Sequence, residues 1–484
     1  ASSAASDVYK RQEQKIAAPK ITPIVTNRDS QSEFLSEIQT SQVQPIEPVF
    51  VDYKKDMSQF EAQPGIDVLY KKNETNDIFT LIYVFNTGTE NDPALNLAFN
   101  YLSYLGTDKM TAEEIASEMY AIACSFGLSA GTNQSWIEIS GLSENMGKAM
   151  EIVEGLIAGA KPDEAILENL KGDMLKSRAD AKLNQSRCFG ALQRYLFYGG
   201  DFIRRTTLTD PALQALTSEQ LLAKIGGLMG KQHEVLYYGP QSEKEVTEAL
   251  AMHHKTSAEL QPLEKKHLQL LPTDESKVLM AQYDAKQLYY LQYANLGKQF
   301  DVAADPEITL YNEYFGGGMN SVVFQEMREA RGLAYTAQAS IMQPNYADTK
   351  YGYMAFIATQ NDKMQMAIEA FDEIINNMPE SEKAFGIAKE ALVSRLRTER
   401  TVKDGVLWSY IRMRDLGLTE PRGKQIFEKA QQMTLADVKA AQEKWVKGRK
   451  YVYGILGDIQ NLDLNYLKTL GPIPVSYTHL TLPT

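Results

Sequence analysis

The sequence predicts an α+β protein that contains two related domains. Expected strands and helices follow one another in grouped order, which is typical of an α+β layer, and this order occurs twice along the chain. A chain of 484 residues is too long for one ordinary hydrophobic core. Its hydrophobic content of 44% and charged content of 23% are those of a globular protein. We therefore expect two domains of ordinary size.

The two copies are related by an internal repeat. Residues 146–157 match residues 364–375 at a constant offset of 218. Farther upstream the offset is 205, where Gly127 lies opposite Gly332. An offset that drifts in this way is what insertions in the loops of two related domains produce.

The expected elements have the same order in both copies. Each copy begins with strands, continues with a helix, further strands and long helices, and closes with a helix and a strand. In the first copy we expect strands at 78–87, 135–140 and 234–238 and helices at 144–158 and 218–229. In the second copy we expect strands at 287–294, 351–359 and 451–456 and helices at 363–377 and 435–446. The two domains are placed at 63–262 and 263–472, and the globular part is expected to start near Gly65.

The remaining segments differ in composition from the domains. Residues 1–12 and most of residues 473–484 resemble translated sequencing-adapter sequence, and neither continues the pattern of its neighbour. We therefore expect the natural protein to extend upstream. Residues 13–62 are rich in Gln, Ser, Pro and Thr and are expected to form a linker, with one short helix at 32–40.

Residues 314–340 are the most informative stretch of the chain. Three glycines at 316–318 precede a segment whose apolar residues recur at helical spacing. This helix is expected to end at Gly332, a C-cap residue, and a strand follows. Arg328 would then lie in the last turns of the helix and Tyr335 at the start of the strand. Taken singly, Arg328 also fits a solvated cation at a helix end, and Tyr335 fits a half-buried strand aromatic.

This stretch closely resembles the C-terminal half of the pitrilysin-type zinc metallopeptidases, the inverted zincins, a group that includes insulinase-like and mitochondrial-processing-peptidase-like proteins. The resemblance covers residues 45–472 and implies that each domain is an antiparallel sheet backed by helices, with two such domains forming a half-shell. In that family an Arg and a Tyr seven residues apart reach across a chamber toward the substrate, and Arg328 and Tyr335 have this spacing. A guanidinium and a phenol can donate to a peptide backbone and to the oxyanion that forms when zinc-bound water attacks it.

The zinc motif of that family, His-x-x-Glu-His, does not occur in this sequence. The five histidines are His233, His253, His254, His267 and His479. The positions that correspond to the zinc helix in the first copy are Leu97, Asn100 and Tyr101, which makes the first domain a degenerate copy without a metal site. His253–His254 lies in a polar stretch and is expected to be a solvated loop. We therefore expect no metal and no cofactor in this chain, and the resemblance places the zinc on a missing or partner half.

Several other classes of function are disfavoured. A net charge of −12 argues against a nucleic-acid surface. The glycines at 316–318 lack a following Lys-Ser or Lys-Thr, so we expect tight packing there rather than a phosphate loop. The two cysteines, Cys124 and Cys188, are too few for a disulfide framework, and no apolar run reaches the length of a membrane span.

Two functions remain open. In the first, the chain is the substrate-binding C-terminal half of a zinc metalloendopeptidase that hydrolyses peptides, and it is inactive without a half, fused upstream or separate, that bears His-x-x-Glu-His. In the second, it is a non-catalytic scaffold or binding subunit of the same fold. The Arg328–Tyr335 pair favours the first function, because a scaffold has no need of it. The expected partners are then the zinc-bearing half and a peptide substrate, and a bacterial periplasm or cell envelope is compatible with this role.

Overall fold

The structure, a computed structural model, describes residues 32–474, and the chain divides into two compact units, Ala1–Glu47 and Pro48–Thr484. In the first unit, helix α2 (Glu33–Thr40) begins after Ser32, whose hydroxyl accepts a hydrogen bond from the Leu35 amide at 3.1 Å. This helix lies where the sequence predicts a short one. The adapter-like sequences at the two ends lie outside the described residues. All further description concerns the second unit.

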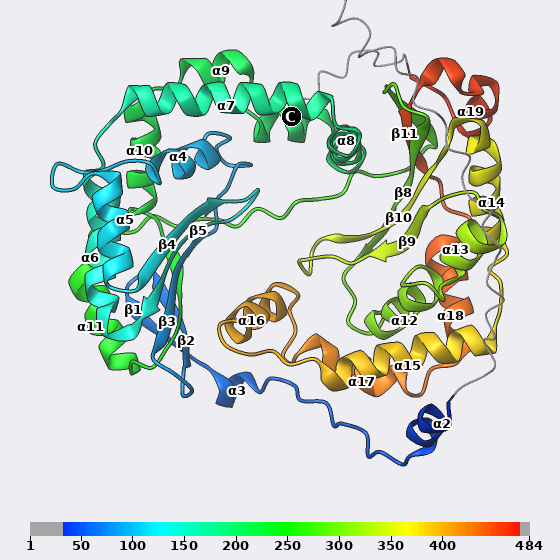
Figure 1. Cartoon of the computed structure of the whole chain (residues 1–484), viewed down its shortest axis with the longest axis horizontal. Helices are drawn as coiled ribbons and strands as arrows, with labels where there is room; N and C mark the ends of the chain where they lie inside the picture. The colour runs from blue at the N-terminus through cyan, green and yellow to red at the C-terminus, as the bar shows by residue number, and fades with distance from the viewer. Residues whose placement is uncertain (1–31, 475–484) are drawn as a thin grey trace, which may run out of the picture. The chain divides into compact units, whose positions relative to one another are not determined.

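The first half of this unit is built on a six-stranded sheet (Figure 1). Its strands are β1 (Ser58–Gln63), β2 (Ile66–Lys72), β3 (Ile78–Phe85), β4 (Cys124–Ala130), β5 (Ser135–Leu142) and β6 (His233–Gly239), in the spatial order β1-β2-β6-β3-β5-β4. The β2–β6 pair is parallel and the other pairs are antiparallel. Because β1 precedes Gly65, the first sheet starts earlier than the sequence predicts.

The second half repeats this sheet without a counterpart of β1. Its strands are β7 (Lys277–Gln282), β8 (Gln287–Gln299), β9 (Thr336–Met342), β10 (Lys350–Gln360) and β11 (Val452–Gly457), in the order β7-β11-β8-β10-β9. Again one pair, β7–β11, is parallel and the others are antiparallel. The order β7-β11-β8-β10-β9 of the second sheet therefore corresponds, strand by strand, to the order β2-β6-β3-β5-β4 of the first sheet. The predicted α+β fold with two duplicated, largely antiparallel sheets is therefore confirmed.

Equivalent positions also make equivalent contacts. The ammonium groups of Lys171 and Lys389, which are 218 residues apart, each donate to a main-chain carbonyl, at 3.1 and 2.9 Å. The expected match of Gly127 with Gly332 is wrong. Gly127 lies inside β4, whereas Gly332 ends the helical segment before β9 with φ +57°. The residue that has this left-handed conformation before β4 is Ala123, with φ +51°, so the loops at this point differ in length from what the sequence indicates.

Helices cover one face of each sheet (Figure 1). The first sheet packs against α4 (Leu95–Leu102), α5 (Ala112–Ala121), α6 (Met146–Gly159), α10 (Ser218–Leu228) and α11 (Glu243–His253). The second packs against α12 (Asp305–Phe315), α13 (Val322–Phe324), α14 (Met364–Asn376), α15 (Glu382–Thr398), α17 (Arg422–Ala430) and α18 (Leu435–Ala441). The other helices are α3 (Tyr53–Asp56), α7 (Glu164–Lys182), α8 (Gln185–Thr206), α9 (Asp210–Ala215), α16 (Gly405–Asp415) and α19 (Leu464–Leu470). Among the described residues, no helix has the length and apolar character needed to cross a bilayer.

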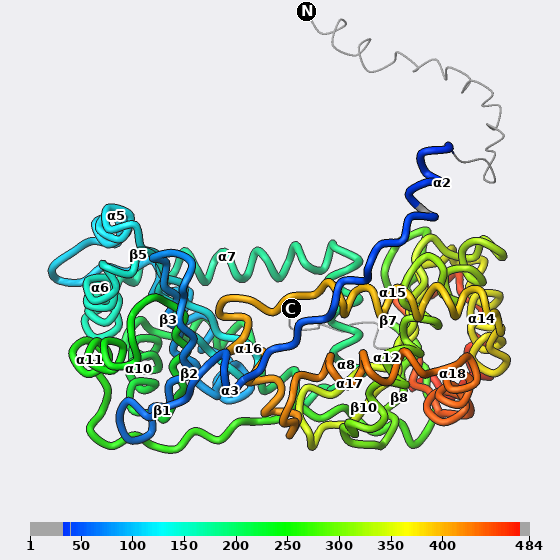
Figure 2. The backbone as a smooth tube through the Cα atoms, turned by 90° about the horizontal axis from the view of Figure 1, so that it is seen from below, coloured from blue at the N-terminus to red at the C-terminus, as the bar shows by residue number. Residues whose placement is uncertain are grey.

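The opposite face of each sheet is covered by a helix from the other half. On α8, Leu196 packs with Leu291 of the second sheet, and on α16, Leu407 packs with Ile82 of the first sheet. Figures 1 and 2 show the same exchange, with α8 beside the second sheet and α16 beside the first. The sequence does not predict this reciprocal packing. It means that each repeat depends on the other to bury its second apolar face.

The expected solvated loop at His253–His254 is wrong for His254, which is 5% exposed. Its Nε2 lies 2.8 Å from Nε2 of His233, and its Nδ1 lies 2.5 Å from Oε1 of Glu154. The polar sequence around His254 gave no sign of this, because Glu154 is 100 residues away in the chain. The group is a buried polar chain inside the first domain.

Candidate functional site

The segment that carries Arg328 is a capped helical turn. Ser321 caps α13 by accepting a hydrogen bond from the Phe324 amide at 3.4 Å, and the helix continues as the π-helical turn η2 (Gln325–Ala330). It ends at Gly332, as the sequence predicts, where the Gly332 amide donates to the carbonyl of Arg328 at 3.2 Å. The π-helical geometry is a difference from the expected α-helix. Single π turns inside helices are often found at functional sites.

The structure brings Arg328 and Tyr335 together. The guanidinium carbon of Arg328 lies 4.7 Å from the centre of the Tyr335 ring and 4.9 Å from that of Phe324, which is cation–π geometry. Tyr335 directly precedes β9, is 75% exposed, and its hydroxyl has no hydrogen-bond partner within residues 32–474. The nearest charge to Arg328 is Glu329, at 3.6 Å from its Nε. Both side chains therefore present hydrogen-bond donors to solvent from one place.

Arg331, on the same segment, has a different environment. Its guanidinium pairs with Glu373 at 2.7 Å and with Glu326 at 3.4 Å. The hydrogen bond that Arg331 donates to Glu373 raises the pKa of the Arg331 guanidinium above its usual range. Arg331 thus links η2 to α14, whereas Arg328 stays available to a ligand.

The glycine run positions β9, the strand that follows Tyr335. A Cβ atom on Gly316 would overlap the carbonyl oxygen of Ala339 in β9, and one on Gly317 would meet the backbone of α12 at 2.8 Å. Gly318 has open space at the same point. The predicted close packing is therefore found at Gly316 and Gly317.

The free edge of β9 is partly occupied. This strand pairs with β10 and ends the second sheet. The side-chain amide of Asn312, from α12, makes two hydrogen bonds with the backbone of Ile341, at 2.8 and 2.9 Å. A peptide added as a further strand would have to displace Asn312. This edge is therefore poorly suited to strand addition.

The residues at the expected zinc-helix positions do not fit a metal. Leu97 and Tyr101 on α4 are fully buried, and the Tyr101 hydroxyl donates to the Ser218 hydroxyl at 2.7 Å. Asn100 is exposed and offers no strong zinc ligand. Among residues 32–474 no group of three or more His, Cys, Asp or Glu side chains is placed to hold a metal ion.

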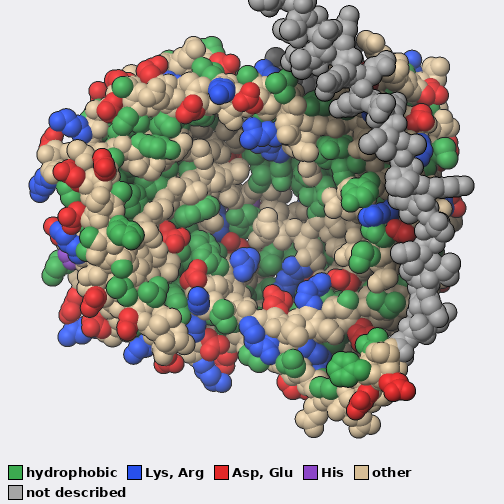
Figure 3. Space-filling model, in the orientation of Figure 1, with side chains coloured by type: hydrophobic (Ala, Val, Ile, Leu, Met, Phe, Trp, Pro, Cys, Tyr) green, Lys and Arg blue, Asp and Glu red, His purple; other side chains and the backbone are tan. Residues whose placement is uncertain are grey.

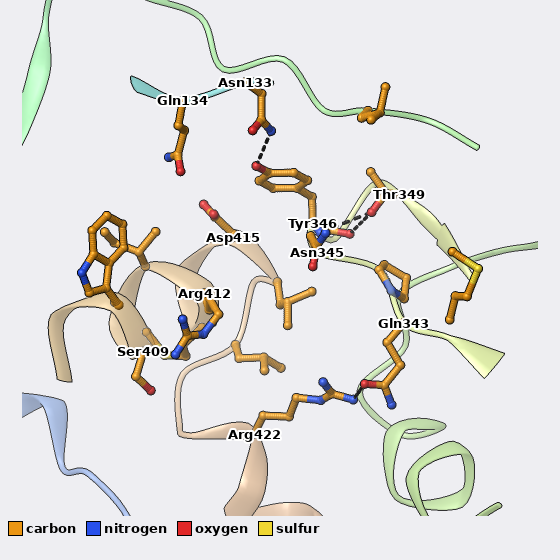
Figure 4. Close-up of a pocket in the computed structure, with 18 of the residues that line it drawn as sticks. Asn133, Gln134, Gln343, Asn345, Tyr346, Thr349, Ser409, Arg412, Asp415 and Arg422 are labelled. Atoms are coloured by element: carbon orange, nitrogen blue, oxygen red, sulfur yellow. Dashed lines mark hydrogen bonds between the residues drawn. The ribbon is translucent and has the colours of Figure 1, made fainter. Parts of the chain in front are cut away.

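A pocket of about 540 Å³ lies where segments of both halves meet (Figure 4). Asn133 and Gln134 come from the loop between β4 and β5, and Gln343, Asn345, Tyr346 and Thr349 come from the segment between β9 and β10. Trp408, Ser409 and Arg412 come from α16, and Tyr53 comes from α3. These segments are far apart in the chain, so no local sequence pattern indicates the pocket.

The charges in this pocket are paired, with two exceptions. Arg422 is held by Asp305 and Gln343, and Asp415 pairs with Lys265 at 2.6 Å. Arg412 and Lys350 form no ion pair in the part of the chain that the structure describes. The pocket is also crossed by a hydrogen bond of 2.7 Å from the Asn133 amide to the Tyr346 hydroxyl, which ties the two halves together (Figure 4).

Comparison with protein families assigns this fold. Residues 231–392 match the family described as the peptidase M16 inactive domain. This part of the chain resembles an M16 inactive domain. The predicted resemblance to the C-terminal half of the pitrilysin-type peptidases, which form the M16 family, is thereby confirmed. Arg328 and Tyr335 lie within the matched residues. The chain is similar to a non-catalytic half of proteins in this protease family.

Several known proteins are similar to this chain. An uncharacterized zinc protease of Streptomyces coelicolor is 24% identical over 257 residues, which cover 50% of this chain and 55% of that protein. The chain thus spans about half the length of this curated relative. The M16 inactive domain of Pseudomonas fluorescens superposes with a TM-score of 0.66 at 19% identity, covering 83% of this chain and 97% of that one. The periplasmic protease PqqL of Escherichia coli superposes with a TM-score of 0.65 at 12% identity, covering 91% of this chain and 49% of that one. Both structures show the same fold.

Proposed function

We propose that this chain is the substrate-binding C-terminal half of a zinc metalloendopeptidase and acts with a half that bears His-x-x-Glu-His. The observation that carries the proposal is the contact between Arg328 and Tyr335, two donors that face solvent together at the end of a capped helical turn. The match to the M16 inactive domain and the zinc protease relative support the same role. The zinc belongs to the other half in this proposal, since the α4 residues do not fit a metal.

In the assembled enzyme Arg328 and Tyr335 bind the peptide bond that is cleaved. The guanidinium N–H groups and the phenol O–H donate to its carbonyl oxygen, and these hydrogen bonds strengthen as that oxygen gains negative charge. The cation–π contact limits the motion of both side chains before the substrate binds. Such preorganised donors lower the barrier because they need no rearrangement during the reaction.

The test uses this chain reconstituted with its zinc-bearing half and a fluorogenic peptide. Tyr335→Phe removes one hydroxyl, and Arg328→Ala removes one guanidinium. Loss of one such donor lowers turnover about 10²–10³-fold. Arg331→Ala is the matched control, because Arg331 pairs with Glu373 and Glu326, and its effect on turnover should be much smaller. Wild-type turnover in both Tyr335→Phe and Arg328→Ala would refute the proposed role and favour the scaffold function.

The same proposal predicts the metal content of the separate chain. Purified alone and dialysed, it should hold far less than one zinc per chain, because strong ligands are missing from the α4 positions. Elemental analysis measures this directly. About one tightly bound zinc per chain would contradict the assignment of the metal to another half.

A further inference from the structure

A second pocket adjoins the one that contains Arg412. It has a volume of about 790 Å³ and lies between α7, α8, the start of α4 and the end of β4. Thr132 lines both pockets, so the two are neighbours, and we refer to them together as the double pocket or the hollow. In the space-filling view, blue Lys and Arg side chains border the hollow in the middle of the molecule (Figure 3).

The charges that line this double pocket are predominantly positive. The basic residues of the lining are Arg178, Arg187, Arg194, Lys350, Arg412 and Arg422. Asp415 is the only acidic residue of the lining within the described part of the chain, and Lys265 neutralises it at 2.6 Å. The lining is therefore opposite in sign to the chain as a whole, whose net charge is −12.

Four of these basic residues have no acidic partner within residues 32–474. Arg178 pairs with Asp210 at 2.5 Å, and Arg422 pairs with Asp305. The four without an ion pair are Arg187, Arg194, Lys350 and Arg412. Unpaired charges of one sign in a hollow concentrate the electrostatic potential there and attract ligands of the opposite sign.

We propose that the double pocket binds an acidic peptide segment, with Arg412 and Arg194 each pairing with a carboxylate. This inference rests on the proposed function and specifies the substrate class: peptides that carry Asp or Glu side chains on the part that lies in the hollow. Arg412 serves the pocket next to α16, and Arg194 serves the pocket next to α8. Arginine suits this task because its planar fork can donate two parallel hydrogen bonds to one carboxylate.

The other lining residues favour a peptide over a nucleic acid. Asn345 and Gln134 carry side-chain amides, which pair with peptide main-chain groups, and Trp408 and Tyr53 add flat apolar surface. A nucleic-acid strand would need basic residues along an extended path. The net charge of −12 on the whole protein also repels a polyanion.

The test measures binding to the full chain alone, without the zinc-bearing half. Fluorescence anisotropy follows a labelled peptide that contains several Glu residues, and a second peptide has Gln at the same positions. The Glu peptide should bind about tenfold or more tightly than the Gln peptide, and added salt should weaken it. A C-terminally amidated Glu peptide should bind as well as the free acid, which separates side-chain carboxylates from the terminal one.

Variants locate the contact. Arg412→Gln and Arg194→Gln should each weaken the Glu peptide about tenfold, the loss expected for a charge-assisted hydrogen bond. Lys383→Gln removes the same charge from an exposed position outside the hollow and should leave affinity unchanged. Binding should also alter Trp408 fluorescence, and Trp408→Phe should abolish that signal.

Three results would overturn the inference: equal affinity for the Glu and Gln peptides, wild-type affinity in Arg412→Gln and Arg194→Gln, or tighter binding of an oligonucleotide of equal charge. None of these depends on turnover. They are therefore distinguishable from failure of the proposed function, which the Tyr335→Phe and Arg328→Ala rates decide.

Discussion

The buried side chains of His233, His254 and Glu154 form a chain of hydrogen bonds. The Lys231 carbonyl can only accept, so His233 donates through Nδ1, at 2.8 Å, and its Nε2 accepts from Nε2–H of His254. The Nδ1 of His254 lies 2.5 Å from Oε1 of Glu154. The Lys255 amide donates to the second Glu154 oxygen at 3.2 Å, so both oxygens of this buried carboxyl group have a hydrogen-bond partner.

This arrangement predicts a loss of stability in mild acid. Burial, and then the neighbouring His254, lower the pKa of His233 from 6.5 to about 4. The unfolded chain therefore binds a proton at His233 at a higher pH than the folded chain does. The contribution of His233 to stability is complete above pH 6.5 and is lost as the pH falls toward 4, by up to about 3 kcal/mol.

Urea unfolding at several pH values between 7 and 4 measures this loss. His233→Phe, which places a ring beside Phe85, should be less stable at pH 7 but should show a smaller decrease across the same window. NMR titration gives an independent check. A His233 pKa near 6.5 in the folded protein would contradict the assignment.

At the scale of elements, local patterns predicted most strands and helices, and irregular features were missed. The alternation of apolar and polar residues and the repeat offset of 218 predicted strands and helices in both copies. The observed elements and sheet topology confirm these predictions. Strand β1 is not predicted by the sequence, because it is a half-exposed edge strand with little apolar alternation. The sequence does not distinguish the π turn at 325–330 from an α-helix, because the apolar spacing of the two is nearly the same.

The glycine run offers a matched pair of variants that tests the role of β9. Gly316→Ala forces a methyl group against the Ala339 carbonyl, so the protein should lose about 1–3 kcal/mol of unfolding free energy. Gly318→Ala adds the same methyl group in open space and should change the unfolding free energy by less than about 0.5 kcal/mol. Chemical denaturation compares the two. Equal effects would show that close packing at Gly316 does not hold β9.

At the scale of the whole molecule, the sequence predicts the Arg328–Tyr335 pair but not the pocket. The pair lies within one short segment, so its spacing is visible in the sequence. The pocket joins Asn133, Tyr346 and Arg412, which come from three distant segments. Their proximity depends on how the two halves pack, and no local pattern encodes it. The basic lining is also not apparent from the sequence, because its cations come from distant segments and the chain as a whole is acidic.

The reciprocal packing of α8 and α16 predicts that the two halves unfold together. Leu407 of α16 is fully buried against the first sheet, although it belongs to the second repeat. Loss of either half would expose an apolar face of the other, so neither sheet is expected to persist alone. Leu407→Ala should cost about 2–5 kcal/mol and should destabilise both halves equally.

Tryptophan fluorescence can separate the halves. The double variant Trp136→Phe/Trp408→Phe leaves Trp445, which is buried in the core of the second half, as the reporter. Adding Leu407→Ala in this background should shift the Trp445 transition in urea as far as it shifts the loss of circular dichroism, which reports on the whole chain. An unchanged Trp445 transition, with a separate earlier loss of circular dichroism, would show that the halves are independent. Coincident shifts would mean that the exchanged helices make the two repeats one cooperative unit, so that the hollow between them keeps its geometry as long as the protein is folded.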